Sequence, residues 1–89
     1  ELPWQQAMDW AADLNVNDHA DFTLPTRAEQ SILFGNLRDQ FEPEWYWSRE
    51  QHAAYSDYAW MQDFGDGNQS DGRKSNDDRA RAVRRLIIQ

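Results

Sequence analysis

The chain contains 89 residues, of which 16 are acidic and 9 are basic, so its formal net charge is −7. This length is typical of one small domain spanning residues 1–89, and it excludes an enzyme with separate cofactor and substrate domains. The negative charge disfavours direct nucleic-acid binding, because phosphate contacts need clustered Lys and Arg, and no apolar run approaches the roughly 20 residues of a membrane span.

The absence of one residue type and the abundance of others exclude further kinds of protein and of site. Cysteine is absent, which excludes disulfides, thiolate metal ligands and a cysteine nucleophile. Twelve aromatic residues, five of them Trp, argue against disorder, because disordered acidic chains are poor in aromatics. No signal-peptide pattern opens the sequence. The absence of cysteine leaves the compartment open and mildly favours the cytosol.

Helical spacing of apolar residues predicts a first helix that begins after Pro3. The residues that share its apolar face are Trp4, Ala7, Met8, Ala11 and Leu14. The helix is expected to end within residues 15–18, which are a run of turn formers. We expect Met8 and the tryptophans to be buried.

An extended link over residues 21–25 leads to a second helix, because Pro25 pushes Leu24 out of the helical region. Thr26 and Glu29 have the spacing of a capping box, which fixes the start of this helix. Pro43 closes the region after the helix end. The predicted apolar face consists of Leu33, Phe34, Leu37 and Phe41.

From residue 45 the pattern changes to short strands. Residues 45–48 are aromatic and strand-like, and residues 58–64 alternate between two faces. The two sets are Tyr58, Trp60, Gln62 and Phe64 on one face, and Ala59, Met61 and Asp63 on the other. Asp66-Gly67 predicts a hairpin turn, followed by a strand over residues 69–74 and a last strand over residues 80–88. Two helices followed by an antiparallel sheet of three to four strands predict an α+β fold.

Charge is divided unevenly along the chain. Residues 1–72 carry 14 acidic and 3 basic side chains, net −11, whereas residues 73–89 carry 2 acidic and 6 basic ones, net +4. Two interpretations remain open. The basic tail packs against the acidic body and neutralises part of it, or a large negative face remains that steers a positively charged partner.

Candidate catalytic and metal sites are weak. Neither His19 nor His52 has a partner at ligand spacing, and the acidic residues 63–71 lack the EF-hand positions, so calcium binding there is a minor alternative. Ser48 and His52 are four residues apart, but their surroundings match no nucleophile motif, so a catalytic pair is also a minor alternative. No glycine-rich phosphate loop is present. We therefore predict no catalytic residue, no metal site and no cofactor.

A series of aromatic and turn motifs follows in a characteristic order. These are Trp4 to Trp10 on the first helix, Asp21-Phe22-Thr23-Leu24-Pro25-Thr26, Tyr46-Trp47-Ser48, Ala59-Trp60 and Arg81-Ala82-Val83-Arg84-Arg85. Over about residues 3–86, this order resembles the Lcl-like domain of bacterial and phage proteins, a domain of largely unknown function. The resemblance implies a compact C-type lectin-like fold with Trp47 and Trp60 in the core.

The chain departs from the family pattern at several positions, which limits what the resemblance implies. Phe22 and Thr23 replace a Trp-Arg pair, and the paired cysteines of many relatives are missing. The lectin calcium motifs are also missing, as are the cysteines of the related formylglycine-generating enzymes. Neither sugar binding through calcium nor that enzymatic activity therefore carries over.

Polar positions between the signature residues are where a lectin-like scaffold varies, so we predict a binding surface there. The candidate residues are Glu50, His52, Tyr55, Asp57, Asp63, Asp66, Asn68, Asp71 and Arg73. Tyr55 lies in the polar segment 50–57 and is expected to be exposed.

Two binding functions follow from this surface. The first is a non-catalytic phage- or prophage-type module that recognises a protein partner through acidic and aromatic loops, in the cytoplasm of a bacterial host or in a phage particle. The alternative is a phage-encoded inhibitor of a bacterial defence system, similar to anti-CRISPR proteins. Its acidic face would mimic nucleic acid and occupy a basic nucleic-acid-binding complex. A thin core rich in aromatics is also compatible with a homodimer.

Overall fold

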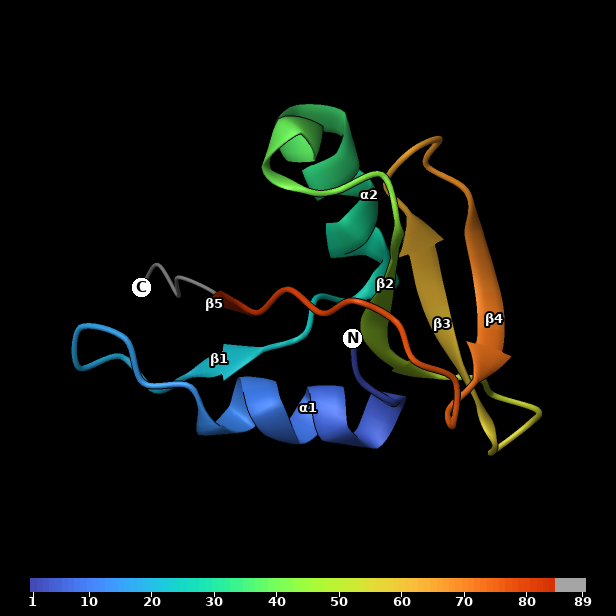
Figure 1. The fold of residues 1–89 in the computed structure, drawn as a ribbon, viewed down its shortest axis with the longest axis horizontal. Coiled ribbons are helices and arrows are strands. Elements are labelled where there is room, and N and C mark those ends of the chain that lie inside the picture. The colour runs from blue at the N-terminus through green and yellow to red at the C-terminus, as the bar shows by residue number, and fades with distance from the viewer. Residues whose placement is uncertain (85–89) are drawn as a thin grey trace.

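The computed structural model describes residues 1–84 (Figure 1). The elements in chain order are α1 (Trp4–Asp13), β1 (Phe22–Thr23), α2 (Arg27–Leu37), a short 3-10 helix (Arg38–Gln40), β2 (Trp45–Gln51), β3 (Tyr58–Asp63), β4 (Gln69–Arg73) and β5 (Val83–Arg84). The strands form two antiparallel sheets, one of order β2-β3-β4 and one that pairs β1 with β5. The predicted α+β class is confirmed. No helix in this part of the chain is long and apolar enough to span a membrane.

The two faces of β3 pack against different helices, and Figure 1 shows β2 running between α1 and α2. Ala59 is fully buried in a core cluster with Ala7 and Ala11 of α1. Gln62 faces α2, where its side-chain amide donates to the backbone oxygen of Gln30 at 3.2 Å. This confirms the alternation predicted from residue 58 onward, because positions 59 and 62 belong to opposite faces.

Two tryptophans tie the core to the chain around it. Trp47 is fully buried, as predicted, and its indole N–H donates to the backbone oxygen of Leu2 at 2.9 Å. The indole N–H of Trp4 donates to the backbone oxygen of Ser48 at the same distance. Burying an indole without a partner for its N–H is costly, so these two bonds let large aromatic surfaces enter a thin core. Trp10 differs from the prediction, because it remains exposed at the end of α1.

The start of α2 is confirmed, and its predicted apolar face is confirmed in part, because Phe34 packs against Phe64 and Phe41 packs against Tyr46 and Phe64. Thr26 and Glu29 form a complete capping box. The fully buried residue of the helix is Gln30, whose side-chain amide donates to the backbone oxygen of Tyr46 at 3.1 Å, while Leu37 is exposed. A polar side chain can occupy this position because strand β2 offers it a carbonyl oxygen. Apolar spacing alone does not reveal such a partner.

The last strand begins later than predicted, at Val83, and belongs to another sheet. Arg79 exchanges backbone hydrogen bonds with Trp45 and Trp47 along the outer edge of β2. The chain then passes to β1, where Val83 pairs with Thr23. Residues 80–82 are not part of a strand, and residues 85–88 of the predicted strand lie outside the described residues. The link over residues 21–25 therefore contains a strand, because β5 supplies its hydrogen-bonding partner.

Basic residues of the tail contact aromatic rings as well as a carboxylate. The cationic groups of Arg73, Lys74 and Arg81 lie 5.4, 4.5 and 5.3 Å from the ring centroids of Tyr58, Trp4 and Phe41 respectively. Arg84 forms an ion pair with Asp21. The cations of the tail therefore contact the body through aromatic rings as well as through a carboxylate, and the charge pattern alone did not predict these cation–π contacts.

Candidate functional site

The nine predicted surface residues divide between the two ends of the three-stranded sheet. Asp63, Asp66 and Asn68 lie at the hairpin that joins β3 to β4, which we call the hairpin end. The others lie on or near the loop that joins β2 to β3. Four of them pack together with the rings of Tyr58 and Trp60. We call this group the aromatic end; it comprises His52, Tyr55, Tyr58, Trp60, Asp71 and Arg73.

At the hairpin end, the predicted residues build the turn. The carboxylate of Asp63 accepts a hydrogen bond from the backbone N–H of Gly65 at 2.7 Å. The carboxylate of Asp66 accepts from the backbone N–H and the side-chain amide of Asn68 at 2.9 and 3.0 Å. These are Asx-turn contacts, which stabilise the loop locally. Among residues 1–84, no group of three or more His, Cys, Asp or Glu side chains could hold a metal ion.

Glu50 also has a structural partner. Its carboxylate accepts a hydrogen bond from the backbone N–H of Arg27 at 2.6 Å, in the first turn of α2. The Arg27 guanidinium carbon lies 3.6 Å from the centroid of the Trp60 ring, and its Nε donates to Gln69 at 3.2 Å. Sequence reasoning missed Arg27, although it is one of only three basic residues before position 73. The scarcity of basic residues in this acidic part of the chain was the signal that could have drawn attention to Arg27.

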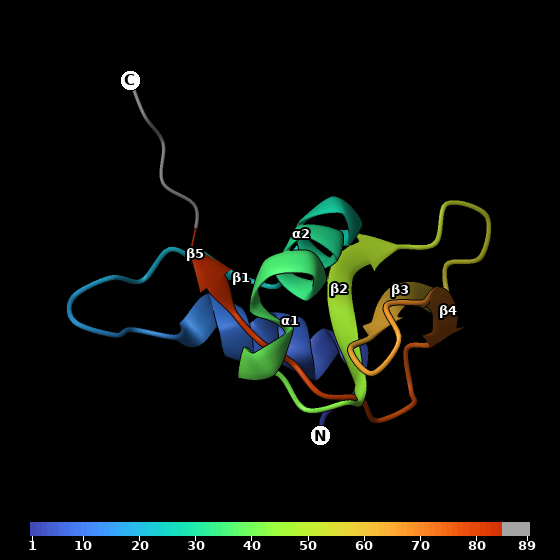
Figure 2. The ribbon, with the colours of Figure 1, turned by 90° about the horizontal axis from the view of Figure 1, so that it is seen from above.

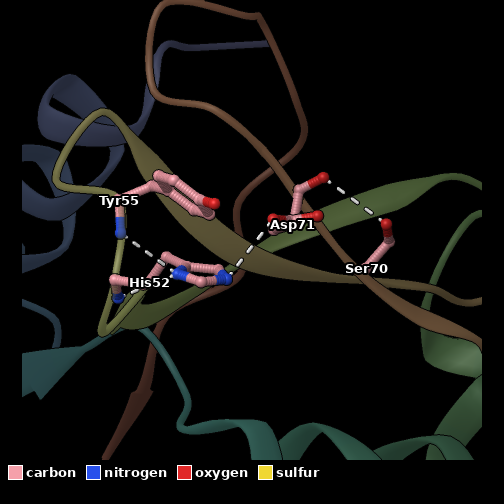
Figure 3. A network of polar contacts seen from close by, with 5 residues as sticks. His52, Tyr55, Ser70 and Asp71 are labelled. Atoms are coloured by element: carbon pink, nitrogen blue, oxygen red, sulfur yellow. Dashed lines mark hydrogen bonds and ion pairs between the residues drawn. The ribbon is translucent and has the colours of Figure 1, made fainter.

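His52 holds the loop between β2 and β3. Its Nδ1 accepts hydrogen bonds from the backbone N–H groups of Ala54 and Tyr55 at 3.0 and 3.3 Å. Backbone bonds between His52 and Tyr58 and between Tyr58 and Tyr55 close the same loop. Because Nδ1 accepts, the proton of the neutral ring is assigned to Nε2, which lies 3.5 Å from a carboxylate oxygen of Asp71. Figure 3 shows this network.

The rings of the aromatic end contact one another in a row, and one pair of them is stacked. The His52 ring is nearly parallel to that of Trp60, at 14° and a centroid distance of 5.3 Å. Tyr55 lies 5.1 Å from His52 and 6.0 Å from Tyr58. As predicted, Tyr55 is exposed, with 63% of its surface accessible. The expectation that Trp60 belongs to the core is wrong, because it is only half-buried and is covered by the polar groups of His52 and Arg27.

The alternative that Ser48 and His52 form a catalytic pair is wrong. Ser48 is fully buried in β2. Its hydroxyl donates to the backbone oxygen of Trp60 at 2.7 Å and accepts from the backbone N–H of Glu50 at 3.1 Å. The hydroxyl of Ser70 is directed to the backbone oxygen of Asp71, at 3.4 Å. Neither hydroxyl is therefore positioned to pass its proton to the imidazole.

A shallow polar cavity of about 280 Å³ borders the aromatic end. It is lined by Asp57, Arg73, Lys74 and Ser75, so two predicted surface residues meet there. Figure 2, seen from above, shows the β2–β3 loop at the same end of the molecule as β4, on the side opposite the turn that precedes β1. This end of the molecule therefore carries the exposed ring of Tyr55, an imidazole and charges of both signs.

Two carboxyl groups away from the aromatic end have shifted pKa values. Burial, together with the nearby charges of Glu1 and Asp77, raises the pKa of Asp78 to about 6. The hydrogen bond from Arg84 lowers the pKa of Asp21. Neither group belongs to the candidate surface, so both shifts concern folding stability.

Comparison with known proteins places the chain in a family. A search of curated proteins finds no match. A family model described as the Lcl C-terminal domain matches residues 1–84, which is nearly the whole chain. The match confirms the resemblance drawn from the motif order, and it includes both the aromatic end and the hairpin end. The chain therefore belongs to the Lcl C-terminal domain family.

Proposed function

We propose that this chain is a non-catalytic binding module, and that it recognises a protein partner through the aromatic end. One observation carries the proposal: Tyr55 is 63% exposed, yet the loop that presents it is fixed by hydrogen bonds to the His52 ring. A large exposed aromatic side chain offers apolar surface that a partner can cover. The same side chain on a rigid loop loses little entropy when a partner covers it.

The surroundings of Tyr55 support a protein partner. Tyrosine offers an apolar ring and a hydroxyl that bonds at the rim of an interface, and it is enriched among residues that dominate binding energy. Asp57, Asp71 and Arg73 provide charges beside the rings, which favour one orientation of the partner. We propose that the module is of phage or prophage type, that it has a lectin-like fold, and that it works in a bacterial cytoplasm.

Affinity capture from a bacterial lysate tests the proposal. Wild-type protein is compared with Tyr55→Ala and with Ile32→Ser, a control at an exposed apolar residue of α2. We expect the wild type and the Ile32 variant to capture the same protein, and the Tyr55 variant to lose it. Equal capture by all three proteins would contradict a role for the aromatic end.

The hairpin end favours a second candidate function, an inhibitor whose acidic face occupies a nucleic-acid-binding complex. Hydrogen bonding between Glu44 and Phe64 brings the acidic segment before β2 beside the hairpin. Glu42, Glu44 and Asp66 are exposed there. Clustered carboxylates attract a basic channel through long-range charge, so capture would be lost at high salt. Capture that survives high salt would count against this candidate.

A further inference from the structure

We infer that the aromatic end binds a basic side chain of its partner, and that the group which fits best is the guanidinium of an arginine, between the Tyr55 ring and the Asp71 carboxylate. The inference rests on the proposed function and names the chemistry that the partner presents.

Two other rings of the aromatic end already carry arginines of this chain. The Arg27 guanidinium carbon lies 3.6 Å from the Trp60 centroid, and that of Arg73 lies 5.4 Å from the Tyr58 centroid. Cations within about 6 Å of a ring centroid are attracted by the ring quadrupole. Tyr55 is the next ring, 6.0 Å from Tyr58, and no cation of residues 1–84 lies over it. The exposed ring of Tyr55 therefore has a face that a partner's cation can take.

Asp71 supplies the opposite charge at the same place. Its side chain is 37% exposed, and one carboxylate oxygen faces His52 Nε2 at 3.5 Å. Figure 3 shows the rings of Tyr55 and His52 both directed toward this carboxylate. The ion pairs found among residues 1–84 include no arginine or lysine at Asp71. A partly exposed carboxylate whose ion-pair partner within the described part of the chain is an imidazole retains capacity for a stronger cationic partner.

Guanidinium matches this combination better than ammonium. It stacks through its flat face on an aromatic ring while its edge donates N–H groups to a carboxylate. Basic side chains of this chain that lie at or beside the aromatic end are held by other rings, Arg73 by Tyr58 and Lys74 by Trp4. They are therefore engaged away from the exposed face of Tyr55. The protein's net charge of −7 would also draw a basic segment toward it.

A peptide titration followed by NMR of the ¹⁵N-labelled full chain tests the inference. The probe is the capped tripeptide Gly-Arg-Gly, and the control is Gly-citrulline-Gly, which keeps the shape of arginine but carries no charge. We expect the arginine peptide to shift the amide signals of Tyr55 and Asp71, and the citrulline peptide to leave them in place. Equal shifts with both peptides, or no shift at millimolar arginine peptide, would overturn the inference.

Variants locate the contact. Tyr55→Ala and Asp71→Asn should each weaken binding of the arginine peptide by about threefold, the order expected for an exposed cation–π or ion-pair contact. Tyr55→Phe keeps the ring and should bind as the wild type does, and Ile32→Ser is the distant control. Wild-type affinity in both Tyr55→Ala and Asp71→Asn would also overturn the inference. If the arginine peptide fails while protein capture still depends on Tyr55, the proposed function stands and this inference falls.

Discussion

His52 shapes the candidate surface by accepting hydrogen bonds from the backbone of its own loop. Its ring takes N–H groups from two residues further along the chain, as an Asx side chain does in a turn. It also stacks on Trp60, which anchors the loop to the sheet. The imidazole therefore connects the position of the exposed Tyr55 to the folded core.

Replacing His52 with Ala should loosen this loop without unfolding the protein. Two backbone N–H groups lose their acceptor, which costs about 1 kcal/mol for partly exposed groups. Hydrogen exchange at Ala54 and Tyr55 should accelerate, while exchange in β3 stays slow. His52→Asn is the matched control, because its side-chain oxygen can still accept from the residue two positions on. Unchanged exchange at both amides in His52→Ala would contradict the assigned role.

Asp78 should make stability fall as the pH rises. Its folded pKa of about 6 lies above the ordinary value of 3.8, so the folded state holds the proton more tightly than the unfolded state does. Protonation therefore favours folding, and this contribution is lost between about pH 4 and pH 6. Asp78→Asn removes the charge and should stabilise the protein at pH 7 by about 1 kcal/mol, after allowance for solvent screening of a half-exposed group.

Urea unfolding of the wild type and Asp78→Asn at pH 4 and pH 7 measures this effect. The advantage of the variant should be largest at pH 7 and should nearly disappear at pH 4. An equal difference at both pH values would show that the charge of Asp78 is not the cause.

The sequence predicted some residues of the candidate surface, but it could not distinguish them from polar residues that only stabilise turns. It selected Tyr55 and Asp71, but it selected Asp63 and Asp66 by the same polarity. A carboxylate that caps its own turn and one that faces solvent look alike in sequence, because the difference lies in where the backbone N–H groups point. Arg27 was missed because its contact with Trp60 joins segments 33 positions apart.

Helices and hairpins are the elements that local chemistry predicts well. The start of α2 follows from the capping box of Thr26 and Glu29, and the β3–β4 hairpin follows from Asp66-Gly67. The burial of Gln30 in α2 and the position of β5 were not predicted, since both depend on contacts with distant segments. Gln30 is buried because Tyr46 offers it a carbonyl, and β5 pairs with β1 across the molecule.

Removing the cap of α2 should destabilise the protein measurably. Thr26→Ala loses the hydrogen bond from the Glu29 backbone and should cost about 1 kcal/mol, whereas Thr26→Ser keeps a hydroxyl and should cost much less. The midpoint of urea unfolding, followed by circular dichroism, measures the difference. Equal midpoints for Thr26→Ala and wild type would contradict the contribution of the cap.

Two glycines should respond to the same substitution in opposite directions. Gly67 has a φ of +84°, and a Cβ there would lie 2.7 Å from the ring of Phe34, so Gly67→Ala should cost about 2 kcal/mol. Gly35 lies within α2 with nothing within 4 Å of its Cβ position, so Gly35→Ala should gain about 0.5–1 kcal/mol. Thermal unfolding of both variants measures the signs. A stabilised Gly67→Ala would contradict the described turn.

Across the whole molecule, the two ends of the three-stranded sheet differ in charge. Glu42, Glu44 and Asp66 are exposed at the hairpin end, while the aromatic end combines contacting rings with charges of both signs. The tail supplies positive charge beside the aromatic end, where Arg73 lies over Tyr58 and Lys74 over Trp4. The net charge of −7 therefore does not describe the aromatic end, where Tyr55 is the most exposed of the large rings.

Site-specific photocrosslinking tests the central claim most directly. The photoreactive residue p-benzoylphenylalanine replaces Tyr55 in one protein and Ile32 in another, and both are irradiated in bacterial lysate. Recognition through the aromatic end predicts one dominant cross-linked protein from position 55, competed away by unlabelled wild type and absent from position 32. A competed cross-link from position 32 with none from position 55 would contradict the account.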